Sequence, residues 1–217
     1  MLRWIHQWPT EPVAGAPVVV LMHGRGADER DLLPVGQRIW PTALVLSVRA
    51  PFEAAPWGYG AGYAWYRYLG GTTPEPESFE QSQQALGEFL DTIEDRLPVP
   101  PGPLILGGFS QGGTMALGHA LRHPGRVPFV LNLSGFLADH PSVVVAPETV
   151  AGAEIFWGHG TLDPSIPFAL ASPGQEALRA AGGDLTTPTW PMGHTIILEE
   201  LAAIQAWLAA RLGRAQP

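Results

Sequence analysis

Ser110 is the residue of this 217-residue chain whose type and surroundings best suit nucleophilic chemistry. It lies in the sequence Gly-Phe-Ser-Gln-Gly, after the apolar residues 104–106 and before residues 114–121, which are typical of a buried helix. A serine on a sharp turn from a strand into a helix exposes its hydroxyl, provided that the residues two before and two after it are small. Gly108 and Gly112 satisfy this condition. We therefore predict a strand, a sharp turn with a nucleophilic serine, and a helix.

A serine nucleophile needs a base that takes its proton and an acid that orients the base. His194 follows the last predicted strand, 185–190, and precedes the closing helix of the chain. Asp163 follows the predicted strand 155–157 in the same way. Because the carboxyl ends of parallel strands meet at one edge of a sheet, we predict that Asp163 and His194 converge there on Ser110.

Two other aspartates are alternatives for the acid. Asp139 follows the predicted strand 127–133, so it would lie at the same edge of the sheet and stays an alternative. Asp184 is closer to His194 in sequence, but it precedes the last strand and would lie at the opposite edge. On strand-end position we favour Asp163.

The negative oxygen that develops during acyl transfer needs two backbone N–H donors. In this arrangement one comes from the residue after the serine and the other from the loop after an early strand. These residues are Gln111 and Arg25, the latter in the glycine-containing loop 23–28 after the predicted strand 17–22. The alternative for this loop is an ordinary tight turn.

This loop and the three residues after it contain several residue types that bind metal ions: His23, Asp28, Glu29 and Asp31. No His-x-x-x-His or Glu-x-x-His spacing supports a metal site, however, and we predict neither a metal nor a cofactor. We expect structural roles for the five histidines other than His23 and His194. These are His6, His119, His123, His140 and His159.

Predicted strands and helices alternate along the chain, which favours an α/β fold with a mostly parallel sheet and helices on both faces. Nothing in the composition indicates a second domain, so we expect one domain over residues 1–217. The predicted strands lie at residues 4–8, 17–22, 43–48, 104–106, 127–133, 155–157 and 185–190. The predicted helices lie at residues 31–40, 78–97, 114–121, 172–181 and 198–212.

Composition excludes several kinds of protein and chemistry. The formal charge is −8 without any basic run, so the pattern of a nucleic-acid-binding protein is missing. Cysteine and lysine are both absent, which excludes thiol nucleophiles, thiolate metal sites and Schiff-base chemistry. The N-terminus has no apolar segment of signal-peptide length, and the longest apolar run, 16–22, is too short to span a bilayer. We expect a cytoplasmic protein without a membrane span.

Residues 49–77 form a long irregular segment that is rich in aromatic side chains, and long loops in compact domains are often functional. Its rings could line an acyl site, with Trp65 as the candidate substrate contact, or could pack over the edge of the sheet. The connection 135–153 is too short to contain a cap over such a site, so we expect an open site. The aromatic residues are Trp57, Tyr59, Tyr63, Trp65, Tyr66 and Tyr68.

Five segments together resemble the serine esterases of the phospholipase/carboxylesterase family, which includes acyl-protein thioesterases and has the α/β-hydrolase fold. The segments are residues 23–28, 108–113, 133–136, 159–167 and 193–194. The resemblance implies a Ser110, Asp163 and His194 triad with oxyanion amides from Arg25 and Gln111. Residues 163–167 have proline and serine where the family usually has a valine-rich sequence, and residues 64–67 match only loosely, so the substrate preference stays open.

The function that we predict is hydrolysis of a small-molecule carboxylic ester or thioester through an acyl-enzyme on Ser110. Two alternatives remain: an acyltransferase that uses the same acyl-enzyme, and a non-catalytic ligand-binding protein with the same fold. The latter usually lacks a member of the triad, whereas all three candidate residues are present here. The sequence gives no prediction of oligomeric state.

Overall fold

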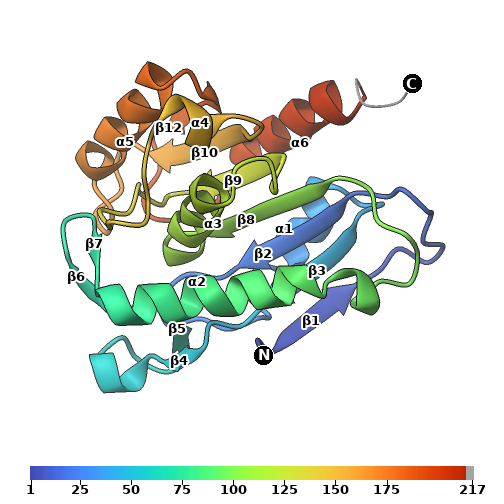
Figure 1. Cartoon of the computed structure of the whole chain (residues 1–217), viewed down its shortest axis with the longest axis horizontal. Coiled ribbons are helices and arrows are strands. Elements are labelled where there is room, and N and C mark those ends of the chain that lie inside the picture. Colours follow the sequence, from blue (N-terminus) through green and yellow to red (C-terminus); the bar gives the residue numbers. More distant parts are fainter. Residues whose placement is uncertain (214–217) are drawn as a thin grey trace.

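A mostly parallel sheet of eight strands lies at the centre of the molecule (Figure 1). The computed structural model describes residues 1–213. Its sheet has the order β1-β3-β2-β8-β9-β10-β11, with β12 also paired to β10, and only β1 is antiparallel to its neighbour. The strands are β1 (Trp4–Gln7), β2 (Val18–Met22), β3 (Leu44–Val48), β8 (Leu104–Phe109), β9 (Phe129–Leu133), β10 (Glu154–Gly160), β11 (Asp184–Thr186) and β12 (Thr189–Trp190).

Helices cover both faces of this sheet, which confirms the predicted fold class. In Figure 1, α2 and α3 pass in front of the sheet and α1 lies behind it. The helices are α1 (Leu33–Ile39), α2 (Pro76–Asp91), α3 (Gln111–Arg122), α4 (Pro147–Val150), α5 (Phe168–Ala180) and α6 (Leu198–Leu212).

Two apolar cores result, because successive side chains of a strand point to opposite faces of a sheet. In the fully buried β2, Val18, Val20 and Met22 belong to the core under α2, α3, α4 and α5. Val19 and Leu21 belong to the other core, under α1 and α6. The central strands are therefore apolar on both faces, as their unbroken runs of valine and leucine predict.

Several element boundaries differ from the prediction. Helix α2 begins at Pro76 with Glu75 as its N-cap, whose carboxylate accepts the N–H groups of Glu77 and Ser78; Ser78 itself is inside the helix. The predicted strand 185–190 is divided into β11 and β12. Pro188 lies between them and has no N–H to offer a neighbouring strand.

The aromatic segment 49–77 folds over the carboxyl edge of the sheet in short elements. These are β4 (Phe52–Glu53) paired with β5 (Tyr63–Ala64), β6 (Tyr68–Gly70) paired with β7 (Thr73–Pro74), and the 3₁₀ helix η1 (Ala55–Trp57). A second 3₁₀ helix, η2 (Glu94–Arg96), follows α2. The connection between β9 and β10 contains only the short helix α4, so no cap is inserted there.

Within residues 1–213, no helix has both the length and the apolar composition that crossing a bilayer requires.

Glu200 is a buried acid on α6, and neither of its carboxyl oxygens has a hydrogen-bond partner within the described chain. It packs against β10, where a methyl group added at Gly158 would lie 2.1 Å from Glu200 Oε1. Burial raises the pKa of Glu200 from 4.5 to about 8, since a charged carboxylate cannot be hydrated there. The side chain is therefore mostly protonated at neutral pH.

The raised pKa of Glu200 predicts an unusual pH dependence of stability. Below pH 4.5, the unfolded pKa of Glu200, the carboxyl group is protonated in both states and the stability that its protonated form contributes is fully present. This stability is lost progressively as the pH rises from 4.5 through the folded pKa of about 8. Because one pKa unit corresponds to about 1.4 kcal/mol, Glu200→Gln should raise the free energy of unfolding by about 3 kcal/mol at pH 7 and by little at pH 4.5. Urea unfolding across this range measures the difference, with the exposed Glu199→Gln as the control. If the difference in the free energy of unfolding between Glu200→Gln and the wild type did not change with pH, the raised pKa of Glu200 would be contradicted.

Candidate active site

Ser110 lies between β8 and α3, so the structure has the strand, turn and helix in the predicted order. Its φ of 54° and ψ of −115° are rare for a residue with a side chain, and such strain is common at functional sites. Its N–H donates to the Leu133 carbonyl at 2.8 Å, which ties the turn to β9. A methyl group at Gly112 would lie 1.9 Å from the Met22 carbonyl oxygen, and one at Gly108 would lie 2.4 Å from the same atom. Larger residues at 108 or 112 would therefore not fit this turn.

Asp163 and His194 are in direct contact. The distance from His194 Nδ1 to Asp163 Oδ2 is 2.6 Å. The other oxygen, Oδ1, accepts the N–H groups of Ser165 at 2.8 Å and Ile166 at 2.9 Å, and the Asp163 side chain is completely buried. A carboxylate held in this way can only accept, so His194 Nδ1 carries the hydrogen and Nε2 is left to bind a proton.

His159 supports the loop that contains Asp163. Its ring is fully buried, and its Nε2 bonds to the Ile166 carbonyl at 2.8 Å. The same nitrogen is 3.8 Å from Asp163 Oδ2. Burial lowers the pKa of His159, so a neutral ring fixes the loop without adding a charge beside Asp163.

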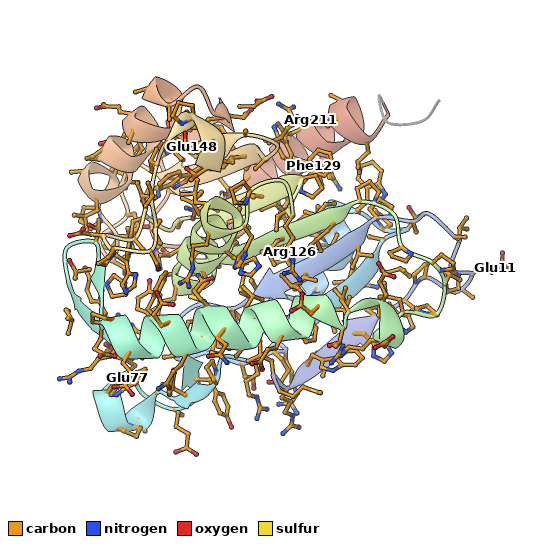
Figure 2. All side chains as sticks on the ribbon, viewed as in Figure 1. Glu11, Glu77, Arg126, Phe129, Glu148 and Arg211 are labelled. Atoms are coloured by element: carbon orange, nitrogen blue, oxygen red, sulfur yellow. The ribbon has the colours of Figure 1, made fainter. Side chains whose placement is uncertain are left out.

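The two alternative aspartates lie elsewhere. Asp139 is exposed and lines a different cavity, beside His140 and Pro173. Asp184 begins β11 at the opposite edge of the sheet, where Arg211 Nη2 lies 3.4 Å from it; Figure 2 labels Arg211 near the end of α6. The structure therefore places Asp163, and neither rival, against the imidazole of His194.

Ser110 and His194 line the same cavity, whose volume is about 150 Å³. Ser110 Oγ and His194 Nε2 form no hydrogen bond within residues 1–213, and such contacts are often loose before substrate binds. The Phe109 ring packs against the imidazole, with 4.6 Å between the ring centres. The residues that line the cavity are Arg25, Tyr66, Tyr68, Phe109, Ser110, Gln111, Phe136, Ser165, Ile166 and His194.

The loop that contains Arg25 is fixed on both sides of this residue. The buried ring of His23 donates from Nδ1 to the Gly24 carbonyl at 2.7 Å and accepts the Ala50 N–H at Nε2 at 3.1 Å. Burial lowers the pKa of His23, which keeps the ring in this neutral form. Gly26, with a φ of 83°, donates its N–H to the Tyr63 carbonyl at 2.8 Å.

The amides of Arg25 and Gln111 have no hydrogen-bond acceptor among the residues that the structure describes. Both residues line the cavity beside Ser110. Free N–H groups next to a nucleophile are what a developing oxyanion requires.

The metal alternative does not fit this loop. Both ring nitrogens of His23 have protein partners, and Glu29 is bound by Arg49, with 2.7 Å between Oε1 and Nη2. Within residues 1–213, no group of three or more histidines and acids is arranged to hold a metal ion.

The prediction for Trp65 as a substrate contact is wrong. Its side chain is completely buried and is not part of the cavity wall. The indole N–H donates to the His23 carbonyl at 3.0 Å, and the backbone N–H donates to Gln111 Oε1 at 3.0 Å. Trp65 therefore supports the loop of Arg25 from behind, while its neighbours Tyr66 and Tyr68 line the cavity.

Three residues of the cavity wall were not anticipated from sequence: Phe136, Ser165 and Ile166. Ser165 and Ile166 follow Asp163 in the same loop, and their amides hold its carboxylate. Phe136 follows the end of β9, and its N–H donates to Thr114 Oγ1 on α3 at 3.1 Å. Their closeness to predicted site residues or to a strand end is a signal that could have identified them.

Comparison with known proteins identifies the family to which the chain belongs. Residues 10–212 match the family described as phospholipase/carboxylesterase. Esterase YpfH of Escherichia coli is 30% identical over 201 residues, which cover 89% of this chain and 82% of that protein. Acyl-protein thioesterase 1 of Cryptococcus neoformans is 25% identical over 227 residues, covering 92% and 94% of the two chains.

The structure of the Bacillus cereus carboxylesterase has the same fold, with a TM-score of 0.82 at 23% identity, and the match covers 97% of this chain and 94% of that one. These similarities confirm the α/β-hydrolase fold and the assignment as a hydrolase. Because the family match extends over most of its length, the chain belongs to the phospholipase/carboxylesterase family.

Proposed function

We propose that the chain hydrolyses short-chain carboxylic esters, and the corresponding thioesters, through an acyl-enzyme on Ser110. The observation that carries the proposal is the 2.6 Å contact between His194 and Asp163, with His194 and Ser110 in the wall of one cavity. Relatives named as an esterase and as an acyl-protein thioesterase support the class of reaction.

In the first half of the reaction, Ser110 Oγ attacks the carbonyl carbon while His194 Nε2 takes its proton. The Arg25 and Gln111 amides bind the oxyanion of the tetrahedral intermediate. Asp163 holds the imidazolium in place and stabilises its charge. The carbon–oxygen or carbon–sulfur bond to the leaving group then breaks, and His194 returns the proton to that group.

In the second half, a water molecule takes the place of the leaving group. His194 removes its proton as the water attacks the acyl-serine. Collapse of the second tetrahedral intermediate releases the carboxylic acid and returns the proton to Ser110. The same amides and the same base serve both halves, so the cycle needs no further group.

The size of the cavity indicates a short acyl group. A protein cavity of about 150 Å³ is large enough for benzene, a molecule of six carbon atoms. The cavity here has this volume, and four of its wall residues are aromatic: Tyr66, Tyr68, Phe109 and Phe136. These rings bury an apolar chain of a few carbons, whereas a long acyl chain would extend into solvent.

A chain-length series tests this size limit. We expect kcat/KM for 4-nitrophenyl esters to be highest between the acetate and the hexanoate, and to be about tenfold lower for the dodecanoate. Thioesters of the same acids should follow the same order, because the acyl group occupies the same cavity. The highest kcat/KM with the dodecanoate would contradict the size argument.

Covalent labelling tests the acyl-enzyme mechanism separately. A fluorophosphonate reacts with an activated serine, and mass spectrometry of the digested protein identifies the labelled peptide. We expect the label on Ser110, with stoichiometric loss of ester hydrolysis. Complete inhibition with the label on another residue would contradict the proposed nucleophile.

A further inference from the structure

The side chain of Arg25 is an exposed cation at the wall of the cavity that contains Ser110. Its guanidinium carbon lies 4.6 Å from the centre of the Tyr59 ring. Stacking of this kind holds a guanidinium in position while leaving its N–H groups free to bind. The Tyr59 hydroxyl is itself fixed, because it accepts the Tyr68 N–H at 2.7 Å.

Arg25 differs from its neighbours in having no carboxylate partner. Arg30, which lies in the same connection between β2 and α1, is 3.3 Å from Asp28, and Arg49 binds Glu29. Within residues 1–213, no carboxylate oxygen lies within 4.0 Å of the Arg25 guanidinium. The binding capacity of this guanidinium is therefore not used inside the protein.

The other groups around the cavity do not neutralise this charge. Apart from Arg25 and His194, the cavity wall is formed by uncharged side chains. The nearby carboxylate of Asp163 is buried behind His194 and bound by two amides. On a chain with a formal charge of −8, a single cation at the site attracts an anionic ligand group against the overall field.

We propose that Arg25 makes the site selective for short esters or thioesters that carry a carboxylate close to the scissile bond. This inference rests on the proposed function, since it concerns the substrate of the same site. A guanidinium binds a carboxylate through two parallel N–H donors, so it selects both charge and orientation. A compact carboxylate also suits a cavity of about 150 Å³. Arg25 thus has two separate roles in these proposals: its amide binds the oxyanion, and its side chain selects the substrate.

Two matched pairs of substrates test the selectivity. On the acyl side, monoethyl succinate is compared with ethyl 4-oxopentanoate, in which a methyl ketone replaces the carboxylate. On the alcohol side, 3-acetoxypropanoate is compared with 4-acetoxybutan-2-one. Within a pair the two esters have the same number of heavy atoms and differ in charge. We expect the wild-type enzyme to prefer the anionic ester of at least one pair by about tenfold in kcat/KM, with a smaller preference in 1 M salt.

Substitution of Arg25 identifies the source of the preference. Arg25→Gln keeps the backbone amide and removes the charge, so the ratio of kcat/KM for the anionic and neutral esters should fall to about one. The matched control Arg30→Gln removes a charge from the same connection between β2 and α1 but outside the cavity, and the ratio should stay at the wild-type value. We use this ratio because any change in turnover that affects the anionic and the neutral ester equally cancels out of it.

Failure of this inference can be distinguished from failure of the proposed function. The role of Arg25 would be overturned if the wild-type ratio of kcat/KM for the anionic ester to that for the neutral ester were one or below in both pairs. It would also be overturned if Arg25→Gln left this ratio unchanged. Both outcomes can occur while the neutral esters are still hydrolysed. Loss of neutral-ester hydrolysis in Ser110→Ala supports the proposed function independently of that ratio. If the wild-type enzyme hydrolysed neither ester of either pair, both proposals would be overturned.

Discussion

Ser110→Ala is expected to lower kcat for ester hydrolysis by about 10⁶-fold, the loss found when a serine hydrolase loses its nucleophile. The hydroxyl that the strained turn presents to the cavity is the atom that forms the acyl-enzyme in the proposed mechanism. Alanine leaves the cavity and the oxyanion amides in place, so substrate binding should be retained. Steady-state kinetics with 4-nitrophenyl acetate, together with equilibrium binding of a non-hydrolysed amide analogue, separate the two effects.

The control for this substitution is Ser172→Ala, on α5 and outside the cavity wall. Its kcat should stay within about twofold of the wild-type value, as is typical of a substitution that touches neither substrate nor triad. Thermal unfolding of both variants shows whether the fold is preserved. Retention of more than about 1% of wild-type turnover in Ser110→Ala would remove Ser110 as the nucleophile.

Asp163→Asn is expected to lower kcat by about 10⁴-fold, although it removes no atom from the cavity wall. The amides of Ser165 and Ile166 point at one oxygen of residue 163, so the carboxamide oxygen of asparagine must take that position. Its NH₂ group then faces His194 Nδ1 and donates to it. The hydrogen of the imidazole moves to Nε2, and the ring can no longer accept the proton of Ser110.

Asp139→Asn is the matched control, because Asp139 is the sequence-based alternative for the acid and lies at another cavity. We expect its kcat to stay within about twofold of the wild-type value. Measuring both variants with one ester decides between the two aspartates. Equal losses in the two variants would show that the contact between Asp163 and His194 does not orient the base.

The main features of the fold and the closeness of Asp163 to His194 were predictable because they depend on local patterns and one topological rule. Unbroken apolar runs gave the buried parallel strands, and residues that follow such strands collect at one edge of the sheet. The pair of glycines around Ser110 specified the turn. Helix α6 was predicted with the bounds that the structure shows, Leu198–Leu212.

The role of Trp65 was not predictable in the same way. Segment 49–77 has no regular periodicity, so the direction of each ring is decided by distant partners. The backbone around Trp65 is held by Gln111, 46 residues away, and by the hydroxyl of Ser82. These partners bury Trp65, whereas Tyr68 stays partly exposed at the cavity, which no local pattern indicates.

Glu200 was overlooked even though a signal was present. It lies four residues before Ile204, and Leu208 and Leu212 continue the same spacing along the buried side of α6. An acid at the first position of such a series either is buried with the apolar side chains or lies at the exposed end of the apolar face. The sequence alone does not distinguish these cases, because the depth of the first turn depends on how closely Gly158 allows α6 to approach β10.

The two functions of Gln111 have a consequence for attempts to broaden the acyl range of this enzyme. Its side chain holds the Trp65 N–H and the Tyr66 carbonyl, and Gln111 itself lines the cavity with a backbone amide that has no acceptor among residues 1–213. Substitutions that shift the backbone at 65–66 to make room for a larger acyl group would also move Gln111, and with it the proposed oxyanion donor. The enzyme would then accept larger substrates but turn them over more slowly. Redesign should instead shorten Tyr68 or Ile166, whose backbones are not anchored by Gln111, so that selectivity and rate can be adjusted independently.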